Sequence, residues 1–383
     1  MVPILIPSEE TLNYIVKPMT TINGNPMVGT VGTRRIAAYL GVKNGAPLSS
    51  FTTPNFVLQK RPTTAAIDAN TVTPFGNPTA SKQTWALNEQ WILSRFHSEV
   101  LTTDIGLPNY GTTGLPATAD TIVNNLASIY SPIMAKDLLG TAFWAHTSFD
   151  PNSDYTGTHD FPAETIANYQ DDNGFMKLLT TALAAGAFNN YKTSNATGGI
   201  NVSGAALSGA NANILMTQML AQSPRKLRNL NSGMGSKFKP YFMISDDFFT
   251  ALQSFVADTY SGVGFGYLIF ADGTDGRPDM NTVLGLMWKG YEVYNSGSIL
   301  DEYWGHTNPA TIYNHMGIFS ARENLSIGVN VKAPTFLNDT GLSIYRRPEP
   351  EKLGAVDLTL YLESDYLISD TSLFSTVGLE LAP

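Results

Sequence analysis

The sequence predicts an α+β fold, in which helices and strands occupy separate stretches of the chain. Three observations lead to this prediction. Residues 211–256 carry two helical patterns around one apolar strand, the last third of the chain is rich in alternating strand patterns, and a polar, Pro-rich stretch at 54–82 lies between strand candidates. The chain has 383 residues, of which 43% are apolar, and this is enough for a sizeable packed core.

The N-terminal part of the chain is expected to form an extended arm followed by a long hairpin. Short apolar clusters separated by Asn, Gly and Pro fill residues 1–50. Strand-like segments at 55–59 and 84–88 then flank a tip that is rich in Thr, Pro, Asn and Ala. Because such a tip lacks the apolar residues to bury itself, we expect the hairpin to protrude from the body.

The middle of the chain shows the periodicity of helices. An amphipathic stripe predicts a helix over residues 120–134, with Asp120 as its cap. Two further helices are expected at 175–186 and 211–222. The stretch 194–210 between them is mostly Gly, Ser, Ala and Asn, which is the composition of a flexible loop.

The clearest local signal is a strand that is followed at once by a helix. Residues 241–244 form an uninterrupted apolar run, and Ser245 follows as a helix cap with two Asp residues behind it, where the helix dipole favours negative charge. Apolar residues then recur on one helix face. We expect three of them to anchor the helix on the strand: Phe248, Leu252 and Phe255.

Alternating apolar residues predict three strands in the last third of the chain, at 284–288, 325–331 and 356–362. The intervening positions are mostly polar or small, so each strand is expected to bury one face and to expose the other to water. A Gly-rich segment at 262–266 has the wrong spacing for a dinucleotide-binding loop and is interpreted as a mobile loop.

Composition and charge narrow the classes of function. The formal net charge is −9, which argues against a generic nucleic-acid coat or a binder of anionic membranes. The absence of Cys excludes disulfides, thiolate metal sites and thiol catalysis. Only 14% of the residues are charged, which suits a chain with large subunit interfaces. Neither a signal peptide nor a membrane-spanning stretch is recognised, so a cytoplasmic origin is expected.

Two segments could carry metal chemistry, and each has a simpler interpretation. His97 and Glu99 have the spacing of a facial iron triad that could recruit His146 or His159, although such a pair on a strand is usually an ordinary surface pair. Residues 150–157 begin like a calcium loop but lack its Gly and its final acid, which favours an Asp- and Asn-rich turn. A metal-dependent oxygenase or a carbohydrate-active enzyme therefore remains the alternative class of function.

A basic segment stands out in this acidic chain. It contains no acidic residue, and its members are Arg225, Lys226, Arg228, Lys237 and Lys239. The simplest interpretation is a solvated connector. The functional interpretation is a local contact with phosphate or with the acidic surface of a partner.

The order of these elements resembles the major capsid protein of tailed phages, the Hong Kong 97 fold. The likeness rests on residues 211–256, with 224–228 and 239–245 inside them, and on 285–293, 316–331 and 356–363. The resemblance implies five parts: an N-terminal arm (1–50), an extended hairpin loop with flanking strands (51–98), a peripheral domain with a long helix (99–254), an axial domain (255–325) and C-terminal strands that return to the peripheral domain (326–383).

The resemblance also implies a function. The chain would be a non-enzymatic subunit that self-assembles into an icosahedral bacteriophage shell around double-stranded DNA. Its partners would be copies of itself in pentamers and hexamers, portal, scaffolding and other virion proteins, and DNA contacted non-specifically, with no membrane and no cofactor. It would assemble in the host cytoplasm, reside in the virion capsid, and use the basic segment on the inner surface or between subunits. No charged helical segment precedes the arm, so scaffolding is expected from a separate protein or from a segment removed earlier. A surface-lattice or adhesion protein is a third class.

Overall fold

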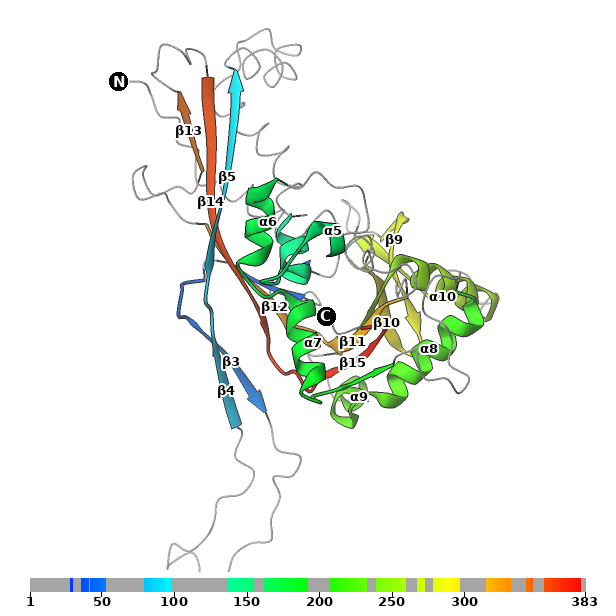
Figure 1. The fold of residues 1–383 in the computed structure, drawn as a ribbon. Coiled ribbons are helices and arrows are strands. Elements are labelled where there is room, and N and C mark those ends of the chain that lie inside the picture. Colours follow the sequence, from blue (N-terminus) through cyan, green and yellow to red (C-terminus); the bar gives the residue numbers. More distant parts are fainter. Residues whose placement is uncertain are drawn as a thin grey trace, which may run out of the picture.

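The fold combines two β-sheets, a separate β-ribbon and helices that cover the sheets (Figure 1). The structure is a computed structural model. It describes residues 28–29, 36–40, 42–52, 79–97, 137–154, 162–191, 207–232, 239–259, 267–272, 278–296, 315–331, 342–346 and 355–379. Helices and strands both contribute to it without regular alternation, so the predicted α+β class is confirmed.

A seven-stranded mixed sheet forms the middle layer of the body. Its strands, in spatial order, are β6 (Asn189–Tyr191), β15 (Phe374–Val377), β11 (Gly317–Ala321), β7 (Pro240–Ile244), β10 (Tyr291–Asn295), β9 (Pro278–Trp288) and β8 (Leu268–Asp272). Strand β7 is buried along its whole length, as the apolar run predicted. Tyr241 and Met243 belong to one apolar cluster and Phe242 and Ile244 to another, because successive strand residues point to opposite faces.

Two helices cover one face of this sheet. Helix α8 (Gly209–Gln222) packs against α10 (Asp246–Thr259), and the short helix α9 (Arg225–Ser232) lies beside them. The hydroxyl of Ser208 accepts the N–H of Asn211, so α8 begins two residues before the predicted start. Phe248 and Leu252 of α10 are fully buried against the sheet, as predicted, whereas Phe255 is only half-buried and lies against Gly209 of α8.

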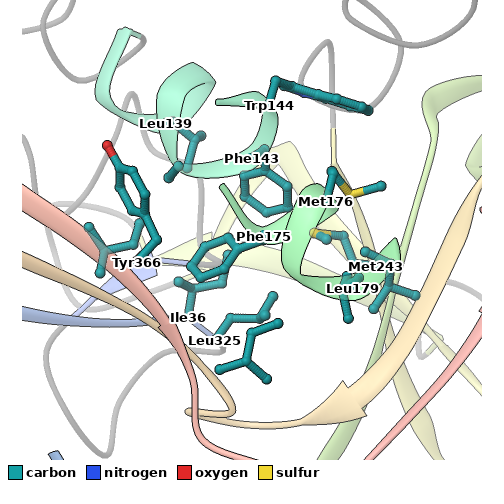
Figure 2. Packing of buried hydrophobic residues seen from close by; sticks show 14 of the residues in the cluster. Ile36, Leu139, Phe143, Trp144, Phe175, Met176, Leu179, Met243, Leu325 and Tyr366 are labelled. Carbon is teal, nitrogen blue, oxygen red and sulfur yellow. The ribbon is translucent and has the colours of Figure 1, made fainter. Parts of the chain in front are cut away.

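The opposite face of the seven-stranded sheet belongs to a larger apolar cluster (Figure 2). Helix α7 (Phe175–Ala184), the helical residues 137–144 and α6 (Ala163–Gln170) contribute to it, and α5 (Pro151–Asp154) lies nearby. The ring of Phe175 packs edge-on against Phe143, with centroids 5.3 Å apart, and stands near Tyr366. Helix α7 occupies the stretch predicted at 175–186 and ends two residues earlier.

The second sheet closes this cluster from the other side. It holds β1 (Val28–Gly29), β2 (Ile36–Leu40), β12 (Leu325–Val331), β14 (Ala355–Ile368), β13 (Leu342–Arg346) and β5 (Asn88–His97). The long strand β14 pairs with β12 through residues 362–368 and with β13 through 356–360, while β5 follows its other edge. In Figure 1 the upper part of β14 projects beyond the body together with β5 and β13.

Two paired strands lie on either side of the predicted hairpin tip. Strand β3 (Pro47–Thr52) pairs antiparallel with β4 (Thr79–Thr84), and this ribbon leaves the body in the opposite direction (Figure 1). The strand predicted at 84–88 is wrong, because β4 ends at Thr84 and β5 begins at Asn88. Residues 85–87 between them turn from one strand to the other as the N–H of Trp85 bonds the carbonyl of Ala46.

One-sided burial holds at residues 286–288 of β9, although the intervening Gly285 is also buried, and it is wrong for β12. On β9, Leu286 and Trp288 are buried and Met287 is exposed, as expected. On β12, the intervening Ser326 and Gly328 are buried as well. The crossing residues 85–87 explain the difference, since the indole of Trp85 lies against Gly328 and covers the face that alternation assigned to water.

Several expectations lie outside the described residues. These are the helix at 120–134, the strand at 55–59, the hairpin tip at 53–78, the Gly-rich loop at 262–266, residues 194–206 of the proposed flexible loop, and Lys237.

Candidate interface: a basic sheet end and two projecting ribbons

The basic segment begins on helix α9. Leu227 is fully buried and anchors the helix, whereas Arg225 and Lys226 are exposed and Arg228 is half-buried. The carbonyl of Pro224 accepts the N–H of Arg228 at 3.2 Å, so the proline that stops α8 also starts α9. Because α9 packs on the body through its apolar side, its cations face outward.

Lys226 is tied down by an acid that is distant in the sequence. Its Nζ lies 3.0 Å from Oδ2 of Asp370, in the turn between β14 and β15. Burial alone would raise the pKa of Asp370, but hydrogen bonds from Ser372 and Lys226, together with the lysine charge, outweigh it and hold the pKa below its usual value. The carboxylate of Asp370 therefore offsets part of the positive charge of Lys226, and the ion pair links α9 to this turn.

The turn that carries Asp370 is fixed by a buried amide. Asn324 accepts the N–H of Asp370 at its Oδ1 and donates from Nδ2 to the carbonyl of Asp370 and to the hydroxyl of Ser320. The turn between β11 and β12 is thus bonded to the turn between β14 and β15. Because the amide is buried, these bonds also satisfy groups that water cannot reach.

Lys239 meets a cation that sequence reasoning missed. Pro240 pairs with Ala321 in the β7–β11 register, so Lys239 and Arg322 are neighbours at one end of the sheet. The N–H of Arg322 bonds the carbonyl of Lys239 at 3.1 Å, and its guanidinium lies 2.8 Å from both carboxylate oxygens of Glu292. Arg322 stands 83 positions beyond Lys239 in the sequence, so only strand pairing could have revealed it.

We use the name basic sheet end for Arg225, Lys226, Arg228, Lys239 and Arg322. Two of these five cations, Lys226 and Arg322, are paired with acids. Arg225 and Lys239 are exposed and make no ion pair with any other described residue. The end of the sheet therefore keeps a small positive surface on a chain of net charge −9.

Two β-ribbons extend the molecule beyond its body. The β3–β4 ribbon has no further strand paired to either edge within the described ranges, and β5 likewise pairs only with β14 there. Open strand edges present rows of backbone donors and acceptors that another chain can bond. Their direction, away from the body on opposite sides, places these edges where neighbouring subunits could reach them (Figure 1).

The base of the β3–β4 ribbon is held at a small junction on the second sheet. Gln83 donates from Nε2 to the carbonyl of Ile368 at 2.8 Å, and the N–H of Ala86 donates to Oδ2 of Asp365 at 2.7 Å. The indole of Trp85 is buried against Gly328 of the sheet and lies beside the ring of Tyr39 on β2, with the ring centroids 5.7 Å apart. The ribbon thus depends on residues 83–86 for its orientation.

Of the four metal-binding candidates from the sequence, only His97 and His146 lie among the described residues. His97 ends β5, Glu99 and His159 lie outside the described residues, and Nδ1 of His146 is 3.2 Å from the hydroxyl of Ser148. The described part of 150–157 is a turn entering α5, in which Asp150 accepts two bonds from Asn152, as predicted. Within the ranges that the structure covers, no group of three acidic or imidazole side chains is placed to hold a metal ion.

No helix among the described residues is both long and apolar enough to cross a membrane.

Comparison with known proteins gives matches among solved structures only. The sequence matches no protein-family model and no curated protein. The fold is similar to a chain of the satellite phage P4 procapsid that includes the size determination protein, with 10% identity, a TM-score of 0.48, and coverage of 94% of this chain and 98% of that one. It is also similar to a chain from Gordonia phage Cozz (10% identity, TM-score 0.42, coverage 94% and 85%) and to one from the cyanophage A-1(L) capsid asymmetric unit (11% identity, TM-score 0.41, coverage 97% and 94%).

Proposed function

We propose that this chain is a shell-forming structural subunit. The observation that carries the proposal is the pair of β-ribbons that project from the body in opposite directions with open edges (Figure 1). An isolated chain leaves these backbone groups to water, whereas a lattice of copies can pair or cover them. The low charged fraction supports extensive contacts between copies, because the centres of subunit interfaces are poor in charge.

The particular member of this class that we propose is the major capsid protein of a tailed phage, with a Hong Kong 97-like fold. Support comes from the segment on which the sequence resemblance rests. Helix α8, strand β7 and helix α10 follow one another there in the expected order, and the basic segment between α8 and β7 begins with the unpredicted helix α9. The proposed parts are the arm (1–50), the hairpin loop (51–98), the peripheral domain (99–254), the axial domain (255–325) and the returning strands (326–383).

The proposed partners follow from this assignment. Copies of the chain form pentamers and hexamers of an icosahedral shell, which encloses double-stranded DNA and resides in the virion after assembly in the host cytoplasm. Portal, scaffolding and other virion proteins bind the shell, and neither a cofactor nor an enzymatic activity is part of the proposal. No arrangement among the described residues favours the alternative of a metal-dependent oxygenase or a carbohydrate-active enzyme.

The proposed role of the basic sheet end is a contact on the inner wall of the shell or in an acidic seam between subunits. A subunit of net charge −9 repels packed DNA, and a few exposed cations give local attraction without strong non-specific affinity. Arg225 and Lys239 are the members available for such a contact, since Lys226 and Arg322 already face acids.

A deletion tests the shell assignment. Removing Thr63–Asn77 shortens the polar part of the hairpin tip and leaves β3, β4 and the body intact, so circular dichroism and cooperative unfolding should match the full chain. Electron microscopy and sedimentation should then show closed shells for the full chain and only small species for the deletion. Normal shells from the deleted chain, or a small defined oligomer from the full chain, would overturn the proposal.

A second experiment separates the two roles of the basic sheet end. Arg225→Gln with Lys239→Gln removes the exposed cations, and Lys43→Gln is the control because Lys43 is also exposed but lies at the ribbon. An inner-wall role predicts assembled shells that retain less DNA, and a seam role predicts assembly that fails or becomes sensitive to salt. Unchanged assembly and packaging would leave the solvated-connector interpretation.

A further inference from the structure

A pair of acidic side chains lies at the junction that holds the β3–β4 ribbon. Asp172 lies in the turn between α6 and α7, and Asp365 lies on β14. One oxygen of Asp172 accepts the N–H of Asn173 at 2.7 Å, but its other oxygen, Oδ2, is buried and has no hydrogen-bond partner among the described residues. A buried carboxylate oxygen without a donor is unfavourable when it is charged and is relieved when the group is protonated.

Asp365 connects this carboxylate to the crossing segment. Its Oδ2 accepts the N–H of Ala86 and its Oδ1 accepts the N–H of Tyr366, both at 2.7 Å. Two residues further along the crossing, Nδ2 of Asn88 donates to the carbonyl of Asp171 at 3.3 Å. Residues 86–88 are therefore bonded to both acidic elements, and any repulsion between those elements acts directly on the crossing segment.

Among the described residues, the groups that face Asp172 carry no positive charge. From β14 they are Asp365 and the hydroxyl of Tyr366, from β5 the amide of Asn88, and from its own turn Asp171. Tyr366 stays neutral, since burial raises its pKa to about 12 even though the hydrogen bonds of its hydroxyl with Thr141 and Ser364 oppose this.

Burial and like charge both act against ionisation here. Burial raises the pKa of Asp172 from 3.8 to about 6, and the charges of Asp365 and Asp171 add to this effect, while the hydrogen bond from the Asn173 N–H and the nearby amide of Asn88 oppose it. Burial also raises the pKa of Asp365, against the hydrogen bonds from Ala86 and Tyr366. Near neutral pH the junction therefore holds two carboxylates that are both disfavoured as anions.

We propose that Asp172 and Asp365 act as a proton-operated clamp, which holds residues 85–88 on the sheet when Asp172 is protonated and loosens them when its proton is lost to solvent. Because the pKa of Asp172 in the docked state lies above that of a free Asp, protonation and docking favour each other. Docking is strongest at acidic pH and weakens as the pH rises through about 6. Loosening frees the base of the β3–β4 ribbon, so the pH controls the direction in which this ribbon projects.

The clamp does not rest on the proposed function, because it concerns one junction within the chain. Its test is amide hydrogen exchange of residues 85–90 between pH 5 and pH 8, corrected for the intrinsic pH dependence of exchange. In the unmodified chain, the exchange protection of residues 85–90 should fall by roughly tenfold from pH 5 to pH 8. This decrease is smaller than the full pKa shift of Asp172 would produce, because solvent reaches part of that side chain.

Variants assign the effect to Asp172. Asp172→Asn keeps the shape and removes the charge, so its protection should stay high and independent of pH. Asp258→Asn, at an exposed carboxylate on α10, should behave like the unmodified chain. Asp172→Ser is a second neutral variant in case the amide does not fold. Protection of residues 85–90 that is flat with pH in the unmodified chain, or that changes equally in a neutral variant, would overturn the proposal.

Discussion

The contact between Trp85 and Gly328 gives the sharpest quantitative test of the fold. A methyl group on Gly328 would lie 2.7, 2.8 and 3.1 Å from three ring carbons of Trp85, closer than side-chain carbons approach one another. The ring must move, and overpacking of this kind destabilises a protein by about 1–3 kcal/mol. The stiffer unfolded chain of Ala returns about 0.4–1 kcal/mol, so the net loss from Gly328→Ala should be about 1–2 kcal/mol.

Trp85→Ala should destabilise the protein more. The side chain is 3% exposed, and burial of about 200 Å² at about 25 cal/mol per Å² contributes about 5 kcal/mol. The site lies on the outer face of the sheet, where water can refill it, so we expect a loss near the lower end of the usual range of about 3–5 kcal/mol.

The two changes together separate this contact from any general effect on β12. With Trp85 already replaced by Ala, a methyl group at position 328 meets no ring, and Gly328→Ala should be neutral or stabilising by up to about 1 kcal/mol. Urea denaturation followed by circular dichroism gives the free energy of unfolding of all four proteins. If Gly328→Ala destabilises both backgrounds equally, within about 0.5 kcal/mol, the ring contact is not its cause and the reasoning fails.

Two further predictions concern the body. Phe248→Ala should destabilise the protein by about 3–5 kcal/mol and Phe255→Ala by only about 1–3 kcal/mol, because the first ring is fully buried and the second is half-buried. Urea denaturation measures both losses, and equal values would contradict this placement of α10. Asn324→Ala removes three side-chain hydrogen bonds at a buried position and should lower the free energy of unfolding by about 2–4 kcal/mol. Amide hydrogen exchange at 369–373 should become faster. A loss below about 1 kcal/mol would mean that other contacts hold the β11–β12 turn to the β14–β15 turn.

Features that depend on neighbouring residues in the chain could be predicted from the sequence. The strand at 240–244 and the helix after Ser245 form where expected, because an apolar run and a helical stripe act within about fifteen residues. Features that depend on long-range pairing could not. The polar face of β12 is covered by Trp85, which comes more than two hundred residues earlier, and no local pattern reports that contact.

The candidate interface shows the same division. The cations on α9 are visible as a cluster because they are adjacent in the sequence. The pairing of Lys226 with Asp370 is not visible there, and the fifth cation, Arg322, joins them only through the pairing of β7 with β11. The residues of the clamp, Asp172 and Asp365, come from elements nearly two hundred positions apart and look like ordinary surface acids in the sequence.

Strand β14 belongs both to the second sheet of the body and to the β5–β14–β13 ribbon, so the two ribbons should differ in stiffness. A load applied along the β5–β14–β13 ribbon passes into the body through one continuous strand, whose ladder with β12 runs from 362 to 368, so several backbone bonds resist in shear at once. A load on the β3–β4 ribbon reaches the body through two short connections, residues 42–46 from β2 and residues 85–87 to β5, which are held by a few separate hydrogen bonds that can break one after another. The molecule should therefore yield less to a pull on the β5–β14–β13 ribbon than to an equal pull on the β3–β4 ribbon.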